Sequence, residues 1–237
     1  MKTGCWLSIA CGVGLFASIT CAQQKVLSFA ANEGHPKQPV APYSIELLPL
    51  ANPRKPTELE RAYVDAFSIL KHKNSCSEFY GGSSAIVALN ELAQQIRPAH
   101  LDRWIGIRMS GETTIVTSMA TGFTFRLFAR AEVNLDGPFY RRSSSTRGTL
   151  PQIGPFEPKT REARVTTMLH ELGHLIRRPD GKWVLPNDGN NTGDSEENTG
   201  RVLEVCGEQI RALHNFSFEE ELLGALAGSN ALGASRG

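Results

Sequence analysis

Two histidines stand four residues apart in this chain, with a glutamate directly after the first, in the segment His170-Glu171-Leu172-Gly173-His174. Positions i and i+4 of a helix share one face, so both imidazole rings can reach a single metal ion. Glu171 would then be close enough to accept a proton from a metal-bound water. The pattern therefore predicts a zinc site that activates water for attack on an amide bond.

The residues around this motif have the period of an amphipathic helix. Thr160 is a candidate N-cap and Pro179 a candidate stop, which predicts a helix over about residues 161–178. The two histidines lie off the centre of the apolar stripe, so the helix has one face for the core and another for a site. In the alternative interpretation they are ordinary core or surface residues, each with its own partner. The stripe consists of Val165, Met168, Leu169, Leu172, Leu175 and Ile176.

Further helices and a small sheet are predicted on either side of this helix. A capping box at residues 57–60 begins a helix that extends to about residue 72, and apolar spacing predicts a second helix over residues 85–96. Ser195 begins a last helix, and residues 136–158 have the composition of a surface loop. The result is an α+β fold with a mainly antiparallel sheet. Its strands correspond to four short runs rich in β-forming residues, at 105–109, 113–119, 123–129 and 132–135.

Composition divides the chain into four segments. Residues 1–22 resemble an export signal, and residues 23–55 read as a flexible leader with a short extended piece at 43–50. Residues 56–216 are enough for one domain with a single core, and residues 217–237 read as a loose tail.

The export signal has a basic start, an apolar stretch and small residues before Gln23. Its apolar stretch is too short and too interrupted for a stable membrane span. Acylation of Cys21, which would make the protein a lipoprotein, is the alternative. Both interpretations predict export, to the periplasm or the extracellular space.

Cys76 and Cys206 are the only cysteines outside residues 1–22. In an oxidising compartment they predict a disulfide that closes a long loop, and two buried free thiols are the alternative. Neither cysteine has the spacing of a zinc ligand.

Without residues 1–22 the chain has 24 basic and 24 acidic side chains, because only Lys2 is removed from the 25 and 24 of the whole chain. This balance gives no indication of nucleic-acid binding.

The motif and the order of the elements resemble zincin-type metallopeptidases of the small exported bacterial kind. The resemblance rests on the five motif residues and on element order over about 160 residues. It implies that His170 and His174 bind zinc, that Glu171 is the general base, and that the substrate is a peptide or protein. It also implies that an extended substrate pairs with a strand edge, for which residues 123–135 are a candidate, although an ordinary core strand is the favoured interpretation of these residues. The alternative function is a catalytically silent binding module of the same fold, with a structural metal or none.

Several carboxylates compete for the place of the third zinc ligand. Asp180 has the offset from His174 at which one group of zincins places its last ligand, but Arg177 replaces the glycine of that group and no Met-turn follows. Asp188 is the alternative, as a loop carboxylate that folds back as in the aspartate-ligand zincins. Glu196 and Glu197 would imitate the zincins whose ligand lies on a downstream helix, although acids at a helix start also favour the helix dipole.

Overall fold

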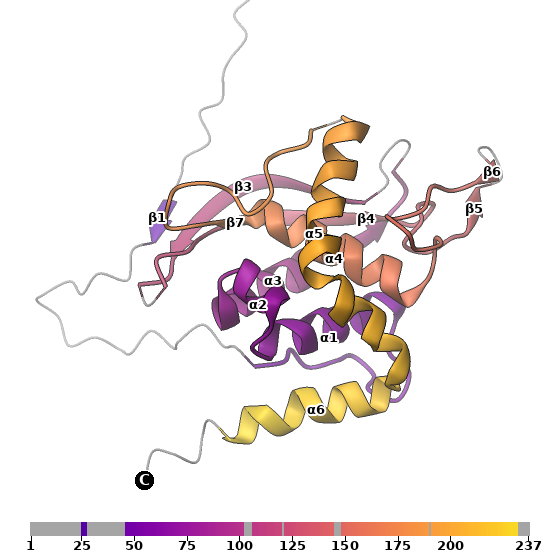
Figure 1. Cartoon of the computed structure of the whole chain (residues 1–237), viewed down its shortest axis with the longest axis horizontal. Helices are drawn as coiled ribbons and strands as arrows, with labels where there is room; N and C mark the ends of the chain where they lie inside the picture. Colours follow the sequence, from indigo (N-terminus) through magenta and orange to yellow (C-terminus); the bar gives the residue numbers. More distant parts are fainter. Residues whose placement is uncertain are drawn as a thin grey trace, which may run out of the picture.

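The computed structural model describes residues 25–27, 46–101, 106–119, 121–144, 148–189 and 191–231. The predicted export signal, Cys21 and most of the predicted leader lie outside these residues. Figure 1 shows a small sheet along one side of the molecule, helices packed beneath it, and α6 (Phe218–Ala231) on the far side. The predicted α+β class is confirmed. No helix among the described residues is both long and apolar enough to cross a membrane.

The sheet is mixed rather than mainly antiparallel. Its centre is the antiparallel pair β3 (Ile107–Thr117) and β4 (Thr124–Asn134). Two further strands run parallel to their neighbours: β2 (Ile96–Ala99) beside β4, and β1 (Lys25–Leu27) beside β3. The two-residue strand β7 (Ile176–Arg177) pairs antiparallel with the start of β4. The parallel strands are three and four residues long, so neither gives a periodic signal in the sequence.

The four predicted runs form two long strands. A register shift between Ser110 and Thr113 takes up the first predicted break, with Gly111 at a φ of +89°. Such an irregularity bends a strand without ending it. The third predicted break, between residues 129 and 132, does not exist, because Arg130 and Ala131 continue the pairing with β3.

The first helices begin close to where the sequence predicts them. Helix α1 (Glu58–Lys71) has its capping box in place: Thr57 accepts from the Glu60 amide, and the Glu60 carboxylate accepts from the Thr57 amide. Helix α3 (Ala85–Gln95) likewise matches its prediction. Between them lie α2 (Ser75–Phe79) and a 3₁₀ turn (Gly82–Ser84).

Helices α4 (Arg161–Leu175) and α5 (Thr192–Ala212) differ from prediction at one end each. Helix α4 ends three residues early, because Ile176 and Arg177 leave it to pair with β4. Helix α5 begins three residues before Ser195, where the Asn191 side chain accepts from the Gly193 amide.

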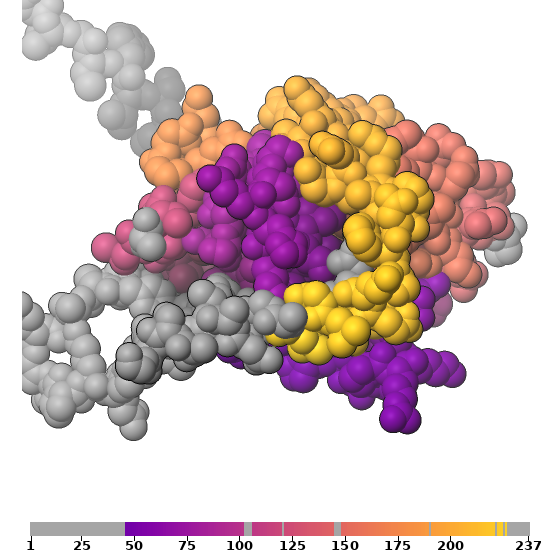
Figure 2. Space-filling model, turned by 60° about the horizontal axis from the view of Figure 1, so that its bottom comes forward, coloured from indigo at the N-terminus to yellow at the C-terminus, as the bar shows by residue number. Residues whose placement is uncertain are grey.

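The predicted loose tail forms α6. Ser217 and Glu220 cap it reciprocally, and Phe218 is buried against the core. Figure 2 shows this yellow C-terminal helix lying against the indigo and purple N-terminal helices. The leader also contributes to the core, since Leu47, Leu48 and Leu50 pack against it.

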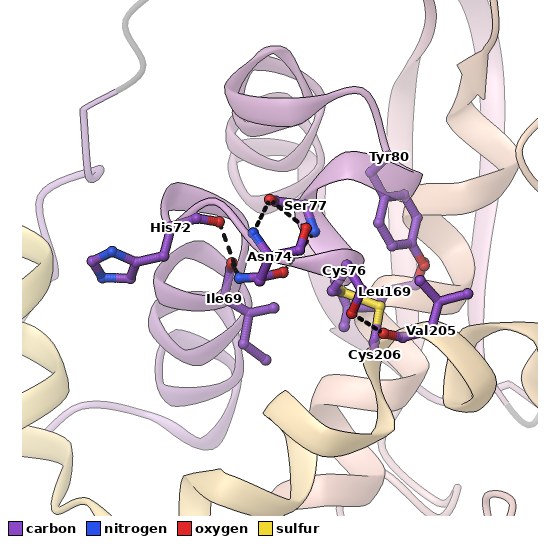
Figure 3. Close-up of a disulfide and its surroundings, with 10 residues drawn as sticks. Ile69, His72, Asn74, Cys76, Ser77, Tyr80, Leu169, Val205 and Cys206 are labelled. Atoms are coloured by element: carbon purple, nitrogen blue, oxygen red, sulfur yellow. Dashed lines mark hydrogen bonds between the residues drawn. A yellow bond between two sulfur atoms is a disulfide. The ribbon is translucent and has the colours of Figure 1, made fainter.

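The predicted Cys76–Cys206 disulfide is present and joins α2 to α5 across 130 residues of chain (Figure 3). Two hydrogen bonds accompany it. The Ser75 hydroxyl donates to the Val205 carbonyl of α5, and the buried Tyr80 hydroxyl donates to the Leu169 carbonyl of α4, each at 2.7 Å. The disulfide region therefore contacts α4 at the residue before His170.

Candidate metal centre

The two motif histidines meet on the buried side of the last turns of α4. His170 and His174 are 6% and 7% exposed, and their Nε2 atoms lie 3.1 Å apart. Oδ2 of Asp188 lies 3.0 Å from His170 Nε2 and 3.5 Å from His174 Nε2. One carboxylate oxygen and two ring nitrogens thus face a common point, with all three ligand atoms within 4.8 Å of one another.

These separations fit one tetrahedral ion. Zinc binds imidazole nitrogen and carboxylate oxygen at about 2.0–2.2 Å, so two ligands of a tetrahedral site lie roughly 3.4 Å apart. The three observed separations of 3.0, 3.1 and 3.5 Å are close to that edge length. The donor set of two imidazoles and one carboxylate is also one that zinc uses in catalytic sites.

A hairpin after α4 brings Asp188 to the histidines. The chain turns at residues 178–182, where the Arg178 amide donates to the Lys182 carbonyl, and runs back along the end of the helix. The Leu185 amide then donates to the Gly173 carbonyl at 3.1 Å. Gly173, the fourth residue of the motif, has no side chain to keep Leu185 away, so Asp188 arrives three residues later beside both rings.

Arg126 of β4 holds the hairpin against the end of the helix. Its Nη2 donates to the His174 carbonyl at 3.1 Å, and its guanidinium stacks on the Trp183 ring at 4.4 Å. Stacking of this kind contributes about 0.5–2 kcal/mol, depending on exposure. Arg126 therefore links the sheet to the backbone of His174 and to Trp183, in the segment that runs back toward α4 after the hairpin turn (the returning segment).

The other carboxylates predicted as alternatives lie elsewhere. Asp180 is exposed at the hairpin turn, where its Oδ1 accepts from the Lys182 amide at 3.0 Å. Arg177, which stands where one zincin group has glycine, pairs in β7. Glu196 and Glu197 are exposed near the start of α5, and Glu197 pairs with Arg201 at 2.6 Å. Of the carboxylates considered, only that of Asp188 is brought to the two histidines.

Glu171 lies beside the start of β3. Its Oε1 accepts from the Ile107 amide at 3.2 Å, and Gly106 leaves room for the carboxylate there. Burial raises the pKa of Glu171 to about 7, against the opposing effects of His170 and the Ile107 amide. A pKa near 7 lets the carboxyl group of Glu171 hold or release a proton close to neutral pH.

The charges of the ligand group are strongly coupled. Burial opposes ionisation of Asp188, but its hydrogen bond to His170 and the two rings lower its pKa to about 2. Burial alone would lower the pKa of His170. The hydrogen bond with Asp188 and the negative charges of Glu171 and Asp188 together have a larger effect, so the pKa is raised. The pKa of His174 is lowered by burial and by the neighbouring His170. The carboxylate is therefore held ionised beside a neutral His174, while His170 favours its protonated form, so a metal ion bound here would have to displace the proton of that ring.

Helix α5 supplies three polar residues for which no role at the site was predicted. Thr199 Oγ1 lies 3.0 Å from His170 Nδ1, and the Asn198 side chain donates to the Pro186 carbonyl at 2.9 Å. The Ser195 hydroxyl helps to lower the pKa of Asp188. The sequence pattern could have identified them, because they continue the buried stripe of α5 toward its N-terminus, at positions where apolar residues would be expected.

The strand edge open beside Glu171 belongs to β3. Strand β4 pairs with β3 on one side and with β2 and β7 on the other, so residues 123–135 form a central strand, as their core-strand interpretation predicts, rather than a substrate edge. Strand β1 pairs with β3 only at residues 114–116. Within the described part of the chain, residues 107–113 therefore have no strand on their outer side.

A cavity lies at the other end of α4. It measures about 290 Å³ and is lined by charged residues of α1 and α4 and by residues 216–218. Arg161 makes a bidentate pair with buried Asp65, and Arg164 pairs with Glu58. These pairs make the cavity part of the packing between the helices rather than part of the metal centre.

Comparison of the chain with protein-family models, with curated proteins and with solved structures gives no significant match.

Proposed function

We propose that this chain is an exported zinc-dependent metallopeptidase of the zincin type. One observation carries the proposal: His170, His174 and Asp188 converge at the spacing of one tetrahedral ion, in a sequence motif that places a glutamate beside the first histidine. The disulfide supports export, because such bonds persist in oxidising compartments.

Each residue has a role in peptide-bond hydrolysis. His170, His174 and Asp188 would hold the zinc ion, which polarises the scissile carbonyl and makes water more acidic. Glu171 accepts the proton of the attacking water and returns it to the leaving amine. A pKa of about 7 suits a group that must take up and release a proton near neutral pH.

The open edge of β3 supports a peptide or protein as the substrate. Residues 107–113 begin at the amide that Glu171 contacts, so a peptide paired with this edge would run past the general base. Main-chain pairing gives affinity without requiring a particular sequence.

A second candidate function is a catalytically silent binding module. Its specific support is the hydrogen bond from the Ile107 amide to Glu171, which could give this carboxylate a structural role in joining α4 to β3. In that case the three ligands would hold a structural metal, or none.

Metal analysis and hydrolysis of three proteins test these functions. Wild-type protein should contain one zinc ion and should cleave a labelled, unfolded casein. Adding a metal chelator should stop this cleavage. Glu171→Gln should keep the zinc and lose turnover by at least about 100-fold, the usual contribution of a general base. His174→Ala should lose the zinc. Retained hydrolysis by Glu171→Gln would refute the assigned base, and a zinc-loaded wild type without hydrolysis would favour the binding module.

A further inference from the structure

Helix α5 presents a polar face to the metal centre at the end of its buried stripe. Farther along the helix, Val202, Cys206 and Ile210 are fully buried. One and two turns earlier the same face carries Asn198, which is 2% exposed, and Ser195. Burying a polar side chain costs free energy unless the side chain makes a specific hydrogen bond. The change from apolar to polar side chains along this face therefore points to specific contacts.

Thr199 contacts the first metal ligand on the ring atom that does not face the site. A neutral histidine that binds metal through Nε2 carries its proton on Nδ1. His170 Nδ1 lies 3.0 Å from Thr199 Oγ1, which can accept a hydrogen bond from it. The contact accommodates that tautomer and restrains the rotation of the ring. Among the described residues, no side chain makes the equivalent contact with the buried Nδ1 of His174.

Asn198 acts on the third ligand through the backbone. Its side-chain amide donates to the Pro186 carbonyl at 2.9 Å, two residues before Asp188. The Asp188 segment is also held at Leu185, through the Gly173 carbonyl, and at Asp188 itself, whose carbonyl accepts from the Asn191 amide at 2.9 Å. One helical face therefore positions two of the three ligand side chains.

The helix that carries these residues is anchored independently of the metal. The Cys76–Cys206 disulfide fastens it one to two turns beyond Thr199, and the Ser75 hydroxyl bonds to the Val205 carbonyl (Figure 3). The polar face is thus held in place before any ion binds.

We infer that Thr199 and Asn198 are positioning residues of the metal centre, which set its zinc affinity by orienting His170 and by holding the segment that carries Asp188. This inference rests on the proposed function for the metal, and it extends the site from α4 to α5. Groups of this kind typically change metal affinity 10- to 100-fold when they are removed.

Zinc affinity of the metal-free protein, measured by competition with a chromogenic chelator, tests the role of Thr199. Thr199→Val should weaken zinc binding by at least about 10-fold, and Thr199→Ser, which keeps the hydroxyl, should restore it. The matched control is Thr166→Val, because Thr166 is buried but its hydroxyl bonds only to the Glu162 carbonyl of its own helix. Unfolding of each metal-free variant in urea verifies that it is folded.

The role of Asn198 is tested by a double-mutant cycle. Asn198→Ala should weaken zinc binding in the wild type but should add nothing once Asp188→Asn has removed the ligand on which it acts. Asn90→Ala is the control, since Asn90 is another buried amide that donates to a backbone carbonyl, that of Glu46, in a different part of the fold.

The outcomes separate this inference from the proposed function. Unchanged affinity in both Thr199→Val and Asn198→Ala, or equal losses in the two controls, overturns the inference even if the protein hydrolyses casein. Zinc binding that depends on Thr199 and Asn198 without hydrolysis supports the inference and contradicts the peptidase. A wild type that binds no zinc overturns both.

Discussion

Leu185 packs directly against the backbone of Gly173, so closely that a Cβ added to Gly173 would lie 2.5 Å from Leu185 Cγ. The glycine of the motif therefore has a steric function: it lets the segment that carries Asp188 pass the end of α4. We expect Gly173→Ala to destabilise the metal-free protein by about 1–3 kcal/mol, as overpacking does, and to weaken zinc binding by displacing Asp188.

The test of Gly173→Ala is urea unfolding together with zinc affinity. Gly200→Ala is its control, because Gly200 also lies in a helix but a Cβ there meets nothing within 4 Å. That control should keep its zinc affinity and gain up to about 1 kcal/mol from helix propensity. Wild-type zinc affinity in Gly173→Ala would show that Leu185 can move without displacing Asp188.

A second glycine determines the position of Glu171, the proposed general base. A Cβ at Gly106 would lie 2.6 Å from Glu171 Oε1, which is the end of a flexible side chain and can move away. Gly106→Ala should therefore change stability little and leave zinc bound, while turnover falls by on the order of 100-fold because the carboxylate is displaced. Casein hydrolysis and zinc content measure the two effects separately. Full turnover in this variant would contradict the proposed placement of Glu171.

Two aspartates of the returning segment should behave differently. Asp188→Asn should weaken zinc binding by more than the roughly 10- to 100-fold typical of an outer-shell group, because it removes a ligand. Asp180→Asn, at the exposed hairpin turn, should bind zinc as the wild type does. Thermal unfolding with and without zinc gives an independent reading, since a ligand at about 100 times its Kd stabilises the folded state by about 2.7 kcal/mol. Equal zinc affinity in the two variants would remove Asp188 from the ligand set.

The disulfide should account for much of the stability. It closes a loop of 130 residues, so the Cys76→Ser and Cys206→Ser double variant should lose about 2–5 kcal/mol of unfolding free energy. Reductant should lower the stability of the wild type to that of the variant and leave the variant unchanged. A wild type that reductant does not affect would show that the bond is absent in solution.

The sequence predicted those features that depend on residues near one another in the chain. The capping box of α1 and the spacing of His170 and His174 are local, because a helix fixes which residues share a face within one or two turns. The α+β class followed from the order of such patterns. The disulfide could be predicted because only two cysteines remain outside residues 1–22.

Other features were decided by contacts between distant segments. The sequence left Asp180 and Asp188 as alternatives, and only the packing of Leu185 on Gly173 brings Asp188 to the rings. The early end of α4, the single long strands β3 and β4 and the helical tail likewise depend on pairing or packing partners far along the chain. Thr199 and Asn198 gained their contacts from α5 crossing the end of α4. Local propensity cannot specify such contacts, because their free energy comes from groups that meet only after the chain has folded.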